Sequence, residues 1–282
     1  YLDILTVRII NARKRIVIFT SLIKDCEETT YLFELLKSVN TSVHVVVFAD
    51  KKRNKWLSNN DYSFLKLIDC GFFSVFHQKG ILIDGKWLYS GVNFTSAYLR
   101  KPIKRYDFLI EGDTVNLKYY SSSNVNSKIY DIAKSSNKKL YIFTPYLNFD
   151  ESLYQIIQEK IELGVDVKVL TTELPFGSSP RVAEKIITKY YFWNINNFSL
   201  HFKDHILLWK STEQSTHLNI ICNENETLWT SSNLNQRSLY FDKQNGVLTK
   251  TSDKYISLLM QGYHPIKKER LTFGRIKRMK FL

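Results

Sequence analysis

The chain has 282 residues, of which 44% are hydrophobic and 14% aromatic, and its formal net charge is +13. This composition excludes a disordered protein, and the length allows one large domain or two medium ones. No apolar run approaches the roughly 20 residues that a membrane-spanning helix needs, so we expect a soluble body. The surplus of Lys and Arg favours an anionic partner, namely nucleic acid, anionic lipid or a phosphorylated substrate. A general bias of the sequence toward lysine is the alternative.

The sequence shows no metal-binding pattern. Cys26, Cys70 and Cys222 are an odd set without CxxC spacing, and the six histidines show no HExxH arrangement. We therefore expect reduced, buried thiols, no metal site and no cofactor. The chain opens at Tyr1 without a start methionine or a signal-like segment. We expect residues to be missing at its amino end.

Two segments of the chain resemble each other. Residues 13–20 and 137–144 each consist of a basic turn followed by a short apolar run typical of a buried strand. An amphipathic stretch with helical spacing and a second strand follow each segment. These elements are expected at residues 28–38 and 42–48 in the first half, and at 151–163 and 165–170 in the second. Repeated strand–helix–strand units predict an α/β fold with parallel strands and helices packed on them.

The first half contains a motif suited to phosphate chemistry. It reads HxKx4D from His77 to Asp84 and is followed by SGVN from Ser90 to Asn93. Alternation along a strand puts His77 and Lys79 on one face, and the Asp-Gly pair predicts a hairpin turn that brings Ser90 and Asn93 back beside them. An imidazole nucleophile, a fixed cation and neutral hydrogen-bond donors suit a phosphate. The alternative is a structural hairpin that carries an incidental surface histidine and lysine.

The second half repeats this motif in altered form. His217, Asn219, Glu224 and Asn233 each stand 140 residues after their counterparts in the first half. Asn219 takes the place of the lysine, and Glu224 takes the place of the aspartate. Ser231 precedes the second asparagine by two residues. The sequence therefore predicts one site with two histidines, of which only the first has an intact motif around it.

These motifs resemble those of the phospholipase D superfamily, whose members pair two HxKx4D motifs to build one site. Within it, the chain is most similar to the CDP-diacylglycerol–serine phosphatidyltransferases of the bacterial phospholipase-D-like type. The phosphatidylglycerophosphate synthases come next. The blocks that carry the resemblance are residues 77–84 with 88–91, 104–107, 142–148 and 232–239. It implies two halves, each a mostly parallel β-sheet flanked by helices, related by a pseudo-twofold axis with the active site between them.

The resemblance divides the chain into a first half at residues 1–112, a second half at 113–264 and a basic tail at 265–282. The tail has apolar residues between its charges, and such a segment can lie on an anionic membrane. Its basic residues are Lys267, Lys268, Arg270, Arg275, Lys277, Arg278 and Lys280. A solvated tail, or one that binds nucleic acid or ribosomes, is the alternative. A second basic patch, residues 51–56, could contact a diphosphate or lipid headgroups, or be an ordinary solvated loop.

The resemblance implies transfer of a phosphatidyl group from CDP-diacylglycerol to L-serine with release of CMP. One histidine would attack the phosphorus, while the other would protonate the leaving group and then activate the alcohol. By position, His77 is the expected nucleophile and His217 the expected acid and base. The other catalytic residues implied are Lys79, Asp84, Asn219 and Glu224, and the phosphate-binding residues are Ser90, Asn93, Ser231 and Asn233. The scheme needs no metal, no cofactor and no second copy of the chain.

Asn219 leaves two interpretations open. A neutral amide cannot replace the field of a lysine, so the chain is either a slowed synthase or an inactive, membrane-associated relative. A synthase that uses glycerol-3-phosphate and a nuclease of the same superfamily are further alternatives. Because the matching blocks are those of the lipid branch, we expect no nucleic acid partner. We expect a cytoplasmic protein that is peripheral on the inner face of the membrane.

Overall fold

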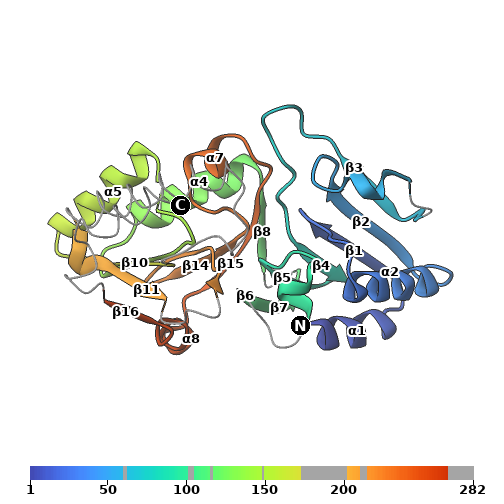
Figure 1. The fold of residues 1–282 in the computed structure, drawn as a ribbon. Helices are drawn as coiled ribbons and strands as arrows, with labels where there is room; N and C mark the ends of the chain where they lie inside the picture. The colour runs from blue at the N-terminus through green and yellow to red at the C-terminus, as the bar shows by residue number, and fades with distance from the viewer. Residues whose placement is uncertain are drawn as a thin grey trace, which may run out of the picture.

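The computed structural model describes residues 1–59, 62–100, 105–114, 117–147, 149–172, 202–209 and 215–265. Within these ranges two β-sheets lie side by side, each with helices against it (Figure 1). The chain passes from the first sheet to the second between residues 113 and 118. This arrangement confirms the predicted α/β class with two sheets flanked by helices. None of the helices in the described ranges has the length and apolar character that a membrane crossing requires.

The first sheet has the strand order β3-β2-β1-β4-β5-β7. Its strands are β1 (Arg15–Thr20), β2 (His44–Asp50), β3 (Leu65–Ile68), β4 (Gly80–Ile83), β5 (Lys86–Ser90) and β7 (Leu109–Asp113). Strands β1 to β3 are parallel, whereas β4, β5 and β7 are antiparallel to their neighbours. The helices of this half are α1 (Leu2–Ile10), α2 (Glu27–Val39), α3 (Ser96–Leu99) and the 3-10 turn η1 (Lys55–Asn59). Helix α2 buries Leu32, Phe33 and Leu36, as the amphipathic pattern predicts.

The second sheet has the strand order β16-β11-β10-β9-β13-β14-β15-β8. Its strands are β8 (Lys118–Ser121), β9 (Lys139–Phe143), β10 (Asp166–Thr171), β11 (Ile206–Trp209), β13 (Ile220–Asn223), β14 (Glu226–Thr230), β15 (Asn245–Lys250) and β16 (Tyr263–Pro265). Its helices are α4 (Ser123–Lys134), α5 (Glu151–Glu162), α7 (Gln236–Tyr240), α8 (Asp253–Met260) and the 3-10 turn η2 (Lys203–His205). Three parallel strands, β9 to β11, again form one side, and antiparallel strands extend it.

The repeated strand–helix–strand units predicted from the sequence match β1-α2-β2 and β9-α5-β10 to within about two residues at each boundary. Each amphipathic stretch becomes a helix because its apolar residues fall on one stripe against a buried parallel strand. The hairpins β4-β5 and β13-β14 add antiparallel strands. His77 and Lys79 directly precede β4 and do not lie in a strand as predicted, and His217 and Asn219 likewise precede β13. Cys222 is buried, whereas Cys26 and Cys70 are half-buried, and all three are free thiols.

The two sheets meet through an aromatic and amide contact layer. Phe108 and Trp229 come from different halves, and their ring centroids lie 5.4 Å apart. Asn245 is fully buried, and its amide bonds the backbone of Lys79 in both directions, with distances of 3.0 and 2.7 Å. The Tyr89 hydroxyl donates to the Asn245 carbonyl at 2.8 Å. The position of the first motif therefore depends on a side chain from the second half.

We predict that Asn245→Ala lowers the free energy of unfolding by about 2–4 kcal/mol, because it leaves the buried backbone N–H and C=O of Lys79 without their partner. Urea unfolding of wild type and variant measures this difference. Asn137→Ala is the matched control, since Asn137 is exposed and its amide bonds only the nearby carbonyl of Ser135. Equal losses in the two variants would contradict the assigned role of Asn245.

Candidate active site

His77 is held against the second half by a short parallel bridge. Phe76 pairs with Lys243 in parallel fashion, and the backbone N–H of His77 donates to the Lys243 carbonyl at 2.9 Å. The next pair along this bridge is His77 and Gln244, and His77 Nδ1 lies 3.0 Å from Gln244 Oε1. Both side chains are buried. The first histidine therefore takes its side-chain partner from the other half.

His217 is held in the same way but with a different partner. The two-residue strand β12 (Ser215–Thr216) pairs in parallel with β6 (Arg105–Tyr106). The next residues along are His217 and Asp107, and His217 Nδ1 lies 3.7 Å from Asp107 Oδ2. Both side chains are again buried. Each half therefore supplies the partner of the other half's histidine, a neutral amide in one case and a carboxylate in the other.

The hydrogen bonds around Gln244 assign the tautomer of His77. Ser231 Oγ donates to Gln244 Oε1 at 2.7 Å, so that the amide oxygen faces both the hydroxyl and the imidazole. An amide oxygen only accepts hydrogen bonds, so His77 Nδ1 carries the proton and Nε2 keeps its lone pair. Burial, together with the positive charges of Lys79 and Arg53, holds the pKa of His77 well below its usual range. The imidazole is therefore neutral at neutral pH, with Nε2 available to attack.

The turns that follow the two hairpins pack on the partners of the two histidines, while the Ser90 hydroxyl itself donates to the Tyr1 hydroxyl at 3.2 Å. The Ser90-Gly91 turn of the first half packs on Asp107, where a Cβ on Gly91 would stand 2.4 Å from either carboxylate oxygen. Only glycine fits there, so Asp107 can approach His217. Ser231 of the second half contacts Gln244 and thereby His77. His217 is also close enough to His77 to lower its pKa, so the two motifs face a common region.

Several amide side chains of the two motifs have an oxygen atom that accepts no hydrogen bond from the described residues. Asn93, Asn219 and Asn233 each have a buried amide oxygen without a hydrogen-bond partner among the described residues. Buried amides are normally paired, so these three oxygens, all within the two motif segments, leave acceptors that a polar ligand could use. Lys79 is completely buried, like Asn219. The two histidines and the residues two positions after them are therefore buried polar groups and not parts of an exposed surface.

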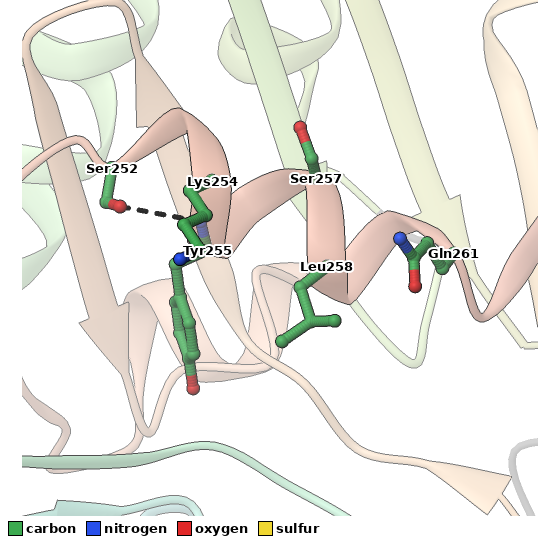
Figure 2. Close-up of a pocket in the computed structure, with 6 residues that line it drawn as sticks. All are labelled: Ser252, Lys254, Tyr255, Ser257, Leu258 and Gln261. Carbon is green, nitrogen blue, oxygen red and sulfur yellow. Dashed lines mark hydrogen bonds between the residues drawn. The ribbon is translucent and has the colours of Figure 1, made fainter.

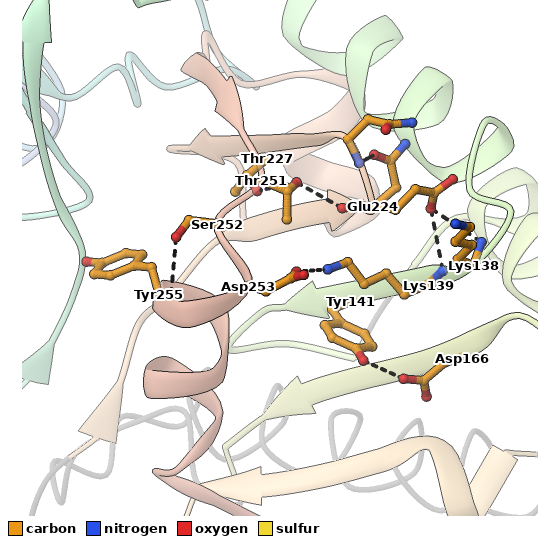
Figure 3. Close-up of polar contacts among 12 residues, drawn as sticks. Lys138, Lys139, Tyr141, Asp166, Glu224, Thr227, Thr251, Ser252, Asp253 and Tyr255 are labelled. Carbon is orange, nitrogen blue, oxygen red and sulfur yellow. Dashed lines mark hydrogen bonds and ion pairs between the residues drawn. The ribbon is translucent and has the colours of Figure 1, made fainter.

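Asp84 and Glu224 hold turns and do not contact the histidines. Asp84 accepts hydrogen bonds from three consecutive backbone N–H groups at 2.7 to 2.8 Å, those of Arg13, Lys14 and Arg15. Glu224 accepts from three N–H groups at the same place in the second half at 3.2 to 3.5 Å, those of Asn137, Lys138 and Lys139 (Figure 3). Asp84 ends β4 on the side away from His77, about 20 Å along an extended chain. The Asp84 carboxylate therefore fixes the turn before β1, and its implied catalytic role stays a prediction.

Three polar groups of the site had no assigned role in the sequence analysis. Gln244 lies 167 residues from His77, and no spacing rule links them. Asp107 falls within a matched block, but its neighbour His217 follows only from the β6–β12 pairing. Arg53 belongs to the basic patch at residues 51–56, and its guanidinium donates to Ser21 Oγ at 3.0 Å. The patch therefore includes at least one residue whose charge acts on the site.

Two other features of the described structure lie outside this site. A surface pocket is lined by side chains on and beside α8, with Tyr255 and Leu258 turned toward it (Figure 2). None of its lining residues is a predicted site residue. Among the described residues, no group of three or more His, Cys, Asp or Glu is placed to hold a metal ion. The predicted membrane-binding residues of the tail, 267 to 280, lie outside the described residues.

Comparison with known proteins supports the resemblance drawn from the motifs. No protein-family model matches the sequence. A CDP-diacylglycerol–serine O-phosphatidyltransferase of Haemophilus influenzae is 28% identical over 142 residues, which are 45% of this chain and 31% of that protein. The chain thus matches about a third of the length of this relative. The crystal structure of Haemophilus influenzae phosphatidylserine synthase superposes with a TM-score of 0.79 at 18% identity, covering 99% of this chain and 91% of that one.

A second solved structure shares the architecture less closely. Polyphosphate kinase from Porphyromonas gingivalis superposes with a TM-score of 0.60 at 12% identity and covers 92% of this chain, but only 44% of the kinase. The fold is therefore that of phosphatidylserine synthase over almost the whole chain. The predicted resemblance to this group is confirmed at the level of the fold.

We predict that Gln244→Glu raises the pKa of His77, because a carboxylate at Nδ1 stabilises the imidazolium form. In the wild type His77 stays neutral as the pH falls through 6.5, and it takes up its proton only at its depressed pKa. In the variant, protonation begins at higher pH. An NMR titration of the His77 ring carbon–proton signals measures both values. Gln261→Glu adds the same charge at an exposed position and serves as control. An unshifted titration of His77 would contradict the contact with Gln244.

Proposed function

We propose that the protein is a phosphatidyltransferase that moves a phosphatidyl group from CDP-diacylglycerol to L-serine, with release of CMP. The observation that carries this proposal is the pair of buried histidines, each held at Nδ1 by a side chain of the other half. Two imidazoles that face one region permit two successive displacements at a single phosphorus. The fold likeness to phosphatidylserine synthase and the name of the curated relative support the same reaction.

The reaction proceeds through a phosphatidyl-histidine. Nε2 of His77 attacks the phosphorus that bears the diacylglycerol, and the bond from this phosphorus to the bridging oxygen of the diphosphate breaks. CMP leaves with the electron pair of that bond and takes a proton from His217. His217 then accepts the proton of the serine hydroxyl as its oxygen attacks the same phosphorus and the P–N bond breaks. The products are phosphatidylserine and the regenerated imidazole.

The unequal partners of the histidines support this division of roles. Gln244 is neutral, so it fixes the tautomer of His77 without stabilising a positive charge on the ring. Asp107 places a negative charge beside His217 and stabilises its imidazolium form, which the first step requires as a proton donor. The unequal partners therefore favour His77 over His217 as the nucleophile.

Arg53 and Arg237 support activity despite the loss of a lysine at position 219. Lys79 is the buried cation of the first motif, and Asn219 offers no charge in the second. Burial lowers the pKa of both His77 and Arg53; the charge of Arg53 adds to this effect at His77, and the charge of Arg237 adds to it at Arg53. Arg237 is ion-paired with Asp242 at 3.5 Å. We assign to Arg53 the larger share of the missing charge.

The remaining parts of the proposal follow from the lipid substrate. The first half at residues 1–112 and the second half at 113–264 each contribute one histidine, and the tail at 265–282 binds the anionic inner face of the membrane from the cytoplasmic side. L-serine is the proposed acceptor because it is the acceptor in the name of the curated relative. Glycerol-3-phosphate is the acceptor to be compared with it.

We expect CMP release from CDP-diacylglycerol that depends on L-serine, and we expect His77→Ala to reduce it at least about 1000-fold because the covalent step is lost. Production of CMP and of radiolabelled phosphatidylserine measures both effects. His44→Ala is the matched control, since His44 is exposed on β2. Nicking of plasmid DNA without CMP release would replace the proposal with a nuclease. The absence of both activities in folded protein would identify an inactive relative.

We expect Asn219→Lys to raise kcat by about tenfold, because it returns a cation to the transition-state phosphate in the second motif. Asn225→Lys adds the same charge at an exposed position of the same half and should leave kcat unchanged. Circular dichroism confirms that both variants fold. An unchanged kcat in Asn219→Lys would show that Arg53 and Arg237 already supply the required charge.

A further inference from the structure

Four aromatic side chains are exposed at one edge of the molecule. Phe72 and Phe73, in the loop between β3 and β4, are 88% and 74% exposed, and their rings contact each other edge to face. Tyr240 and Phe241, at the end of α7, are 62% and 54% exposed. The surfaces of water-soluble monomers rarely group large apolar side chains in this way without a binding role.

The two aromatic pairs lie side by side although they come from different halves. The Val75 N–H donates to Asp242 Oδ1 at 3.1 Å, and Phe76 forms a bridge with Lys243. Phe72 and Phe73 therefore directly precede the segment that contains His77, and Tyr240 and Phe241 directly precede the segment that pairs with it. Figure 1 shows the β3–β4 loop and the end of α7 at the same edge of the molecule, opposite α1. Phe73 is four residues from His77, which is at most about 14 Å of extended chain.

Lysines surround these aromatics. Lys52 Nζ lies 6.0 Å from the centroid of the Phe72 ring and donates to the Ser74 carbonyl at 3.3 Å. Lys51 is exposed next to it and pairs with Asp69 at 3.5 Å. Lys243 is exposed on the other half and lies close enough to the loop to lower the pKa of Cys70. The charge around the aromatic side chains is therefore predominantly positive.

We propose that these seven residues, the aromatic rim, insert into the surface of a bilayer that contains anionic lipid. The rim consists of Phe72, Phe73, Tyr240 and Phe241 with Lys51, Lys52 and Lys243. Aromatic side chains favour the boundary between headgroups and acyl chains, and lysines beside them are drawn to anionic headgroups. A protein partner or a second copy of the chain would not by itself favour this combination of aromatic and cationic groups.

The aromatic rim gives a lipid donor a route to His77. This part of the inference rests on the proposed function. A rim within about 14 Å of His77 lets a diphosphate headgroup reach the imidazole while its acyl chains stay in the bilayer. The rim would act independently of the basic tail, because its residues come from the turn after β2, the β3–β4 loop and the segment at the end of α7. It also explains why the exposed aromatics come from both halves at the point where these halves meet.

The test compares Phe72→Ser/Phe73→Ser with Val7→Ser/Ile10→Ser in the full chain. Val7 and Ile10 are 58% and 57% exposed on α1, so the control also removes two exposed apolar side chains, although smaller ones, at the opposite edge. Vesicles of 30% phosphatidylglycerol in phosphatidylcholine are the probe, and co-sedimentation measures binding. We expect the rim variant to bind at least about tenfold more weakly and the control to bind as wild type. Lys52→Ser/Lys243→Ser should weaken binding by about tenfold at low salt and less at high salt.

Activity in detergent separates this inference from the proposed function. In mixed micelles the rim variant should release CMP at the wild-type rate, and in vesicles it should be slower. Wild-type vesicle binding by the rim variant would overturn the inference, even if CMP release is normal. If the rim variant binds vesicles more weakly but the wild-type chain releases no CMP, the membrane role of the rim stands and the proposed reaction is rejected. A concentration-dependent dimer that the rim variant loses, with unchanged vesicle binding, would assign the surface to a second copy of the chain instead.

Discussion

The site depends on two short parallel β-bridges that cross between the halves. One joins Phe76 to Lys243, and the other joins β6 to β12, so that each histidine lies directly beyond a bridge. A parallel bridge fixes register, and the next residue on each strand must therefore stand opposite its partner. Neither half contains a complete histidine environment. Correct packing of the two sheets, through Asn245 and the aromatic layer, is thus a condition for the chemistry as well as for stability.

The same crossing produces the electrostatic difference between the histidines. Gln244 and Asp107 occupy comparable places at the two bridges, yet one is neutral and the other carries a charge. Because both positions are buried, the charge of Asp107 acts on His217 in a medium of low dielectric. In the proposed reaction, this difference suits His77 to attack and His217 to donate a proton.

Local features of the site could be predicted from the sequence, whereas most of its long-range contacts could not. The β4-β5 hairpin could be predicted because the Asp-Gly turn between two apolar runs acts within about 20 residues, but His77 and Lys79 lie before β4 and not within a strand. The partners of the histidines could not, since Gln244 meets His77 only through the packing of the two sheets. Asp84 was placed in the site because it belongs to the motif, whereas its carboxylate is used by the backbone of the preceding turn. Sequence spacing gives the position of Asp84 in the motif, but its role depends on the backbone N–H groups that need an acceptor at that place.

The neutral residues at positions 219 and 244 are best understood together. A lysine at 219 would lower the pKa of His77, as Lys79 and Arg53 do, and a carboxylate at 244 would raise it. The chain has neither a lysine at position 219 nor a carboxylate at position 244. Both effects on the pKa are therefore absent, and His77 keeps its neutral form. Asn219 with a carboxylate at 244 would instead favour a protonated His77 that cannot attack. In the proposed reaction, the amide of Gln244 keeps His77 able to attack although position 219 lacks a lysine, and Arg53 is the cation proposed to balance the charge of the phosphate.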